Sequence, residues 1–283
     1  MRGKNVIFIA LTAVALAAAL PPLLDLYRSG IHFDYYSHIP LIPAVSAYVL
    51  FRRRKEIFKS SASFHPLGAA TMAAAAGFFL AVRPPASDTI GRAAVASLAA
   101  LVFWWGAYVA LHEKSGRRRV LFPFAFLLFA VPVPVAAMER IIAVLLAGST
   151  LMTRALFEAL GIPLVQEGAL FRLPGFGVEI ARECSGIRSS LALLITTVVA
   201  GQLFLRRPWQ RALLALAVLP VAVFKNAVRI VTLYLLSYFV DIRIIEEGFL
   251  HRSGGFLFFG LGLFALGLIR LLIKGLGSRP EKA

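Results

Sequence analysis

The apolar residues of this chain come in long, nearly continuous blocks rather than at amphipathic spacing. A helix that crosses a membrane needs about 20 mostly apolar residues. Eight segments qualify, of which the third and fifth are short and the seventh is long: Val6–Leu24, His32–Phe51, Pro66–Val82, Arg92–Leu111, Val120–Val135, Ile187–Leu205, Arg211–Val240 and Gly254–Ile273. The pattern predicts an all-α fold, a polytopic membrane helical bundle of about eight transmembrane helices, forming one integral membrane domain over residues 1–283.

Two stretches do not fit this pattern. Met138–Leu160 is apolar but is interrupted by Glu139, Arg140, Arg154 and Glu158. It is predicted to be one interfacial or re-entrant helix on the outer side of the membrane. The segment from Gly161 to Glu183 is rich in Gly and Pro, and Ala169–Leu173 alternates like a short strand, which predicts a small outer hairpin.

The composition supports lipid as the solvent, and the basic residues set the orientation. Hydrophobic residues make up 59% of the chain and charged residues 16%, whereas soluble domains have roughly 45–50% and about 25%. The net charge is +16, but the basic residues cluster in short loops, so membrane topology explains them better than nucleic-acid binding. If the N-terminus is cytoplasmic, 17 of the 30 Lys and Arg lie in cytoplasmic segments and nine on the opposite side. The chain is therefore predicted to be a multi-pass protein of the cell membrane with both termini in the cytoplasm.

The only cysteine is the first candidate for chemistry. Cys184 lies in the sequence Glu183-Cys184-Ser185-Gly186-Ile187-Arg188, where the outer segment enters the sixth predicted span. A thiol at a helix N-terminus has a lowered pKa because the helix dipole and nearby cations favour the thiolate. Arg188 would add to this effect. The alternative is a small buried residue without reactivity.

Two further residues are predicted to lie on the same side of the membrane. Arg229 follows Arg211 by 18 residues, which corresponds to about 27 Å of helix rise, close to a hydrocarbon thickness of roughly 30 Å. His251 lies at the outer start of the last span, and Asn226 shares a helix face with Arg229. The alternatives are a snorkelling or structurally paired arginine and a structural histidine.

Together these side chains could catalyse peptide cleavage. The Cys184 thiolate would attack a peptide carbonyl, His251 would protonate the leaving amine, and Arg229 would stabilise the thiolate or the oxyanion. Asn226, Arg188 and Glu183 are predicted to support this set.

No cofactor is predicted, and Cys184 lacks the neighbouring Cys and His that a metal site needs. His32 and His38, with Asp34 between them, could bind a metal, although an interfacial surface with Tyr35 and Tyr36 is the favoured interpretation.

An ordered set of short motifs resembles the exosortase/archaeosortase family of membrane cysteine proteases and transpeptidases. The resemblance covers most of the chain. It rests on Tyr36-Ser37-His38 with Pro40 and Pro43, Arg52-Arg53-Arg54, Phe122-Pro123 through Val131-Pro132-Val133-Pro134, Glu183-Cys184-Ser185-Gly186-Ile187-Arg188, Asn226-Ala227-Val228-Arg229-Ile230, and His251 with Gly255. It implies that Cys184, Arg229 and His251 are the catalytic residues.

The resemblance also implies a substrate class. The partners would be exported proteins whose C-terminal sorting signal consists of a short motif, one transmembrane helix and a basic tail. Cleavage would occur at the outer membrane face, with transfer to an acceptor such as a membrane lipid. Two other interpretations stay open: a non-enzymatic transporter or flippase for polysaccharide or lipid intermediates, with Lys225 and Arg229 lining its path, and an acyltransferase that uses His251 with a bound lipid.

Overall fold

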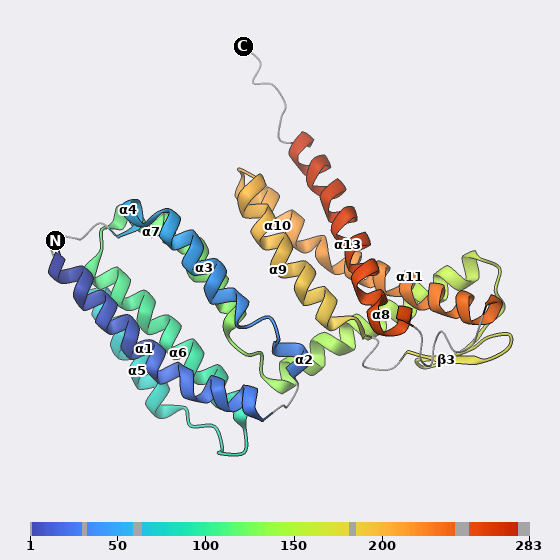
Figure 1. The fold of residues 1–283 in the computed structure, drawn as a ribbon, viewed down its shortest axis with the longest axis horizontal. Helices are drawn as coiled ribbons and strands as arrows, with labels where there is room; N and C mark the ends of the chain where they lie inside the picture. The colour runs from blue at the N-terminus through green and yellow to red at the C-terminus, as the bar shows by residue number, and fades with distance from the viewer. Residues whose placement is uncertain (1, 30–32, 59–63, 181–184, 241–248, 277–283) are drawn as a thin grey trace, which may run out of the picture. The chain divides into compact units, whose positions relative to one another are not determined.

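The chain folds into helices with one small sheet (Figure 1). The computed structural model describes residues 2–29, 33–58, 64–180, 185–240 and 249–276. The chain divides into two compact units, residues 1–137 and 138–283. The all-α bundle predicted from the apolar blocks is confirmed, while the single domain over residues 1–283 stays a prediction.

The first unit consists of seven described helices and one 3-10 turn. They are α1 (Arg2–Arg28), α2 (Phe33–Tyr36), α3 (Leu41–Arg52), α4 (Arg54–Ile57), α5 (Pro66–Ala81), α6 (Thr89–Leu111), α7 (Lys114–Leu127) and the 3-10 turn η1 (Leu128–Ala130). Local signals set several of the ends. Pro66 occupies the first turn of α5, where its missing N–H has no helical partner to lose. The Asp88 carboxylate accepts a hydrogen bond from the Gly91 N–H at 2.7 Å and so caps α6.

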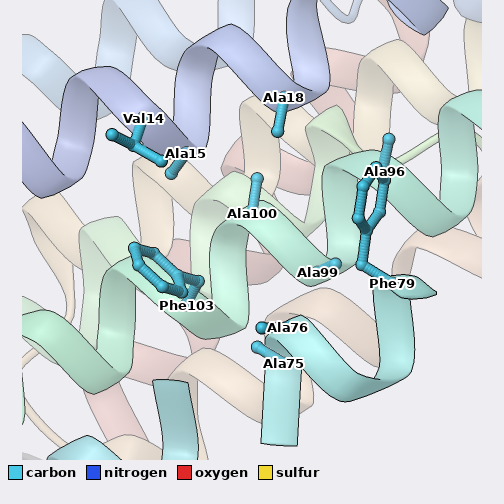
Figure 2. A pocket seen from close by; sticks show the side chains of 10 residues that line it. All are labelled: Val14, Ala15, Ala18, Ala75, Ala76, Phe79, Ala96, Ala99, Ala100 and Phe103. Carbon is cyan, nitrogen blue, oxygen red and sulfur yellow. The ribbon is translucent and has the colours of Figure 1, made fainter. Parts of the chain in front are cut away.

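Small residues let α5 and α6 approach closely. A β-carbon added at Gly68 would lie 2.3 Å from the backbone nitrogen of Ala110 and 2.6 Å from the carbonyl oxygen of Gly106. Such small-residue contacts are typical of helices that associate in a membrane. Where α1 joins the pair, alanines and two phenylalanines leave an apolar cavity of about 160 Å³ (Figure 2). Its lining consists of Val14, Ala15, Ala18, Ala75, Ala76, Phe79, Ala96, Ala99, Ala100 and Phe103, which offer no side chain for catalysis.

The prediction of one continuous helix over His32–Phe51 is wrong. The described part of this segment has a four-residue helix, a turn at residues 37–40 and then the 12-residue α3. Pro40 explains the break, because proline disfavours helical geometry in the residue before it. Hydropathy averaged over the segment does not register this local effect.

The predicted span Val120–Val135 is also interrupted, although the segment lies beside α3. The helix stops at Leu127, η1 follows, and residues 131–134 are not helical before the next helix, since Pro132 and Pro134 cannot donate backbone hydrogen bonds. Three contacts join the path to α2, α3 and α4. Arg119 pairs with Glu56 at 3.0 Å, Ser46 Oγ donates to the Pro123 carbonyl at 3.1 Å, and Tyr36 Oη donates to the Val133 carbonyl at 2.7 Å.

The second unit begins within a long helix and contains the sheet. Its elements are α8 (Val135–Ala159), β1 (Val165–Glu167), β2 (Leu170–Arg172), β3 (Gly177–Glu179), α9 (Ile187–Phe204), α10 (Pro208–Leu216), α11 (Val218–Phe239) and α13 (Phe249–Leu276). The long span predicted over Arg211–Val240 is divided at Ala217 into α10 and α11. Helices α9, α10 and α13 lie alongside one another (Figure 1).

Six helices among the described residues are long and apolar enough to cross a membrane. They are Gly3–Arg28, Thr89–Leu111, Val135–Ala159, Ile187–Phe204, Pro208–Phe239 and Gly255–Leu276. Two apolar helices, Leu41–Arg52 and Pro66–Ala81, are shorter. The third of the six is α8, which by length and composition qualifies as a span. Its predicted interfacial or re-entrant position on the outer side therefore stays a prediction.

The predicted outer hairpin is present and has a third strand. β1, β2 and β3 form an antiparallel sheet in sequence order, with Val165 opposite Arg172 and Leu170 opposite Glu179. Phe171 is fully buried against Phe157 of α8, and Tyr234 of α11 donates to the Pro174 carbonyl at 3.0 Å. The sheet is thus held against the C-terminal halves of α8 and α11.

Candidate active site

The cysteine motif leads into a sharply turned helix start. Gly186 is the N-cap of α9 and has a φ of 71°, in the left-handed region that favours glycine. Its carbonyl oxygen accepts three hydrogen bonds, from Ser190 N at 2.9 Å, Ser190 Oγ at 2.8 Å and Ser189 Oγ at 3.0 Å. The residue two positions after Cys184 is therefore fixed by the first turn of α9.

Asn226 of α11 lies directly against this turn. A β-carbon on Gly186 would be 2.9 Å from Asn226 Oδ1 and 3.1 Å from its Cγ. Asn226 is 1% exposed, and its Nδ2 donates to Ser149 Oγ of α8 at 3.0 Å. The asparagine of the second motif thus contacts the glycine of the cysteine motif, and Ser149 of α8 accepts a hydrogen bond from that asparagine.

A second polar contact joins the same two helices. Lys225, which precedes Asn226, is 3% exposed, and its Nζ donates a short hydrogen bond to Ser189 Oγ. Its hydrocarbon stem lies beside α13, because a β-carbon on Gly262 would be 3.5 Å from Lys225 Cδ. The amine is the one polar group of this buried side chain, and Ser189 Oγ accepts a hydrogen bond from it.

The position of Arg229 follows from the contacts at the two ends of α9. At one end, Arg211 Nε donates to the Leu205 carbonyl at 2.9 Å. At the other end, Asn226 touches Gly186. Arg229 is partly buried and three residues farther along α11, so it lies about 4.5 Å of helix rise beyond that contact. Arg229 and Gly186 therefore lie toward the same end of α9, while the depth of Arg229 in the membrane stays a prediction.

The remaining predicted site residues are described only in part. Cys184 and Glu183 lie outside the described residues. The backbone of His251 belongs to the first turn of α13, one helical turn before Gly255, and its side chain is outside the description. The mutual geometry of Cys184, Arg229 and His251 therefore stays a prediction.

A groove between α9 and α13 runs beside the motif. It has a volume of about 300 Å³ and is lined by Arg188, Ser189, Ala192, Gly255, Phe256 and Phe259. Arg188 is exposed, and Phe256 is 83% exposed. The groove therefore combines an apolar wall with one cation and one hydroxyl, and it lies next to the residues that follow Cys184 and His251 in the chain.

The described residues offer no metal centre. No group of three or more His, Cys, Asp or Glu within them could hold a metal ion. His32 and the Asp34 side chain are outside the description, so the alternative between a metal pair and an interfacial surface stays open there. Burial lowers the pKa of His38, an effect that hydrogen bonds to the backbone of Phe129 and Tyr35 partly offset.

Two residues that shape the site were not predicted from the sequence. Ser149 and Ser189 are single hydroxyl residues in apolar helices, and such residues often bond only to their own helix. Thr150 does so with the Leu146 carbonyl at 2.9 Å. Only the packing of α8 and α9 against α11 distinguishes the two serines from such residues.

The comparisons with known proteins agree with the motif order. A family model described as Transmembrane exosortase (Exosortase_EpsH) matches residues 31–268, which is most of the chain. The match includes Cys184, Arg229 and His251. Neither a curated protein nor a solved structure matches the chain.

Proposed function

The chain belongs to the transmembrane exosortase family, and from this premise we propose that it is a membrane-embedded cysteine protease or transpeptidase. Its substrates would be exported proteins with a C-terminal sorting signal made of a short motif, one transmembrane helix and a basic tail. The observation that carries the proposal is the contact between Asn226 and Gly186, which joins the asparagine–arginine motif to the cysteine motif.

The proposed reaction uses three side chains. The Cys184 thiolate attacks the carbonyl carbon of the scissile peptide, so that a C–S bond forms while Arg229 stabilises the charge on the oxygen. The C–N bond then breaks, and His251 gives its proton to the leaving amine. Water, a membrane lipid or another nucleophile attacks the thioester, which transfers the acyl group and restores the thiol.

The groove between α9 and α13 supports a substrate that lies within the membrane. Its apolar wall, which includes Phe256 and Phe259, suits a hydrophobic helix, and Arg188 suits a polar or anionic group at the end of that helix. The transmembrane segment of the substrate would lie along this groove, and cleavage would occur at the end of that segment. The proposed location is the outer face of the cell membrane, as the basic loops predict.

The transporter alternative places Lys225 and Arg229 along a path for anionic groups. Lys225 is instead buried, and its amine bonds to Ser189, so its side chain already has a role within the helix packing. This observation favours the protease proposal. The acyltransferase alternative shares His251 with the protease but does not require Cys184.

The test is processing of a co-expressed substrate by wild type and by Cys184→Ala. The substrate would be a protein encoded beside this chain that ends in a motif, one span and an Arg/Lys tail. Wild type should shorten it, and Cys184→Ala should leave it at full length while remaining inserted, helical and monodisperse in detergent. Full processing by Cys184→Ala would overturn the proposal, because cleavage would then not depend on the thiol.

A further inference from the structure

A wide cavity lies in the second unit where α9 ends and α10 begins. It has a volume of about 850 Å³, within the range of sites that take small molecules. Its walls come from the end of α9, the connection at residues 205–207, the start of α10 and the last turn of α13. The proposed reaction uses none of its lining residues.

The lining of this cavity carries positive charges and no negative one. Four of its residues are basic and none is acidic. Arg206, Arg207 and Lys274 are exposed, and Arg211 is half-buried. The described helices α9, α10, α11 and α13 contain no Asp or Glu. Like charges that share a cavity repel one another, so the cavity attracts an anion from its surroundings.

Hydrogen bonds to neutral groups hold Arg211 in place. Its Nε donates to the Leu205 carbonyl at 2.9 Å, and its Nη1 donates to Gln202 Oε1 at 2.5 Å. Its Nη2 lies 3.5 Å from the Arg206 carbonyl oxygen. All three acceptors are neutral, so the guanidinium is oriented and keeps its full positive charge. A guanidinium has more N–H groups than these contacts use, so Arg211 can also donate to a ligand.

A buried glutamine joins the walls of the cavity. Gln210 is 5% exposed, and its Nε2 donates to the Ile273 carbonyl of α13 at 3.1 Å. Its Oε1 accepts a hydrogen bond from the Arg207 N–H at 3.3 Å. The start of α10 is thus held against both the end of α13 and the connection from α9. The backbone around the cavity is therefore fixed, which reduces the ordering that binding would cost.

The cavity also has an apolar side that faces outward. Leu203 and Phe204 line it and are 69% and 56% exposed. Trp209, the second residue of α10, is 45% exposed, and tryptophan is enriched where the hydrocarbon of a membrane meets the headgroups. A soluble anion would gain nothing from Leu203 and Phe204, whereas a lipid would place its acyl chains against them. Cations beside an apolar surface therefore favour a lipid as the ligand.

We propose that this cavity binds the headgroup of an anionic phospholipid. The phosphate accepts hydrogen bonds from Arg211 and meets the exposed cations around it, while the acyl chains lie along Leu203 and Phe204. Basic pockets between membrane helices bind such headgroups. The basic loops predict that this end is cytoplasmic, where anionic lipids make the membrane surface negative. The inference does not depend on the reaction proposed for Cys184.

The test measures phospholipid binding to the full-length protein by native mass spectrometry in a neutral detergent. The ligands are phosphatidylglycerol, phosphatidylcholine with the same acyl chains, and glycerol phosphate, which has the anionic headgroup without the chains. The cavity variant combines Arg206→Gln, Arg207→Gln and Lys274→Gln. Arg211 stays unchanged because its bonds hold the end of α9.

The matched control combines Arg52→Gln, Arg53→Gln and Arg54→Gln in the first unit. These three residues are exposed, so the control removes the same charge away from the cavity. Circular dichroism checks that both triple variants remain helical. The comparison of ligands on the wild-type protein needs no variant.

Phosphatidylglycerol should bind the wild type at least about tenfold more tightly than phosphatidylcholine, and the cavity variant should lose at least about tenfold in affinity. The control variant should bind phosphatidylglycerol like the wild type. Equal affinities of the wild type for the two lipids, or equal losses in the two triple variants, would overturn the inference. Displacement of phosphatidylglycerol by an equal concentration of glycerol phosphate would also overturn it, because the acyl chains would then contribute nothing.

Discussion

The side chain of Asn226 occupies the space that a β-carbon on Gly186 would need. That β-carbon would lie 2.9 Å from Asn226 Oδ1, closer than a β-carbon and an amide oxygen normally approach. Gly186 also has a φ of 71°, so glycine satisfies two separate conditions at this position, one of backbone conformation and one of space. The cysteine motif and the asparagine–arginine motif are therefore fitted to each other.

Gly186→Ala should reduce substrate processing sharply. The left-handed conformation costs an L-residue roughly 1–2 kcal/mol, and the new methyl group must also displace Asn226 and its bond to Ser149. We expect processing to fall by at least about tenfold, which corresponds to about 1.4 kcal/mol. The initial rate of conversion of the co-expressed substrate measures this.

Gly161→Ala is the matched control for that change. Gly161 has the same φ of 71°, but nothing lies within 4 Å of an added β-carbon. Gly161→Ala has the same conformational cost but does not contact the site. The free energy of unfolding of this variant should fall, while its processing rate should stay near wild type. Equal losses of processing in Gly161→Ala and Gly186→Ala would mean that the contact with Asn226 has no functional weight.

Arg229→Gln should lose about 100-fold in processing rate, the usual cost of removing a donor that stabilises a developing oxyanion. Arg229→Lys should recover part of the loss, because the charge returns without the planar fork of the guanidinium. The measurement is the processing rate at saturating substrate expression.

Arg154→Gln serves as the control for Arg229. Arg154 lies on α8 and pairs with Glu158 at 2.7 Å, and both side chains are more than half exposed. Such a pair contributes little, about 1 kcal/mol or less. A wild-type rate in Arg229→Gln would exclude Arg229 from the reaction.

The helical regions could be predicted because apolar blocks select helices in lipid. The distance from Arg211 to Arg229 does not follow from the residue count alone, because the segment between them is divided at Ala217 into α10 and α11. The positions of the helix breaks depend on single residues. Pro40 and Pro132 carry that signal in the sequence, but a hydropathy average over 20 residues conceals it.

The fitted contacts at the site could not be predicted, because they arise between elements. Ser149 and Ser189 resemble other hydroxyl residues in apolar helices until α11 is packed against both. Gly186 lies in a motif that suggests a turn, but nothing in the sequence states that Asn226 fills the space beside it. The sequence predicts which residue types could act together, and the packing determines which of them touch.

Both ends of α8 are predicted to lie on the outer side of the membrane. The helix is 25 residues long and apolar enough to cross, yet a crossing there would invert every later segment and move Arg206, Arg207 and Arg211 outside. In a Cys184→Ser background, Pro134→Cys and Leu160→Cys should both react with a membrane-impermeant maleimide on intact cells. Both positions are exposed in the structure.

Arg207→Cys in the same background is the control for the cytoplasmic side, and it should react only after the membrane is permeabilised. Labelling of Pro134→Cys and Leu160→Cys from opposite sides would show that α8 crosses. The orientation of α9, α10, α11 and α13 would then have to be reversed, and with it the outer position of the proposed active site.

Stability of the first unit should fall in mild acid because of His112. This residue follows the end of α6, is 1% exposed, stacks on Tyr108 at 4.8 Å and lies edge-on to Phe8 at the same distance. Burial lowers its pKa below the ordinary value of about 6.5, although a backbone hydrogen bond to Tyr108 partly opposes this. As pH falls through about 6.5, the unfolded state binds a proton that the folded state rejects, so folding stability decreases.

The melting temperature in detergent should therefore be lower at pH 5.5 than at pH 7.5. His112→Phe retains an aromatic ring and removes the titration, so the difference in melting temperature should shrink, with the remainder assigned to His38, whose pKa burial also lowers. An unchanged difference in His112→Phe would show that protonation of His112 does not control the acid sensitivity.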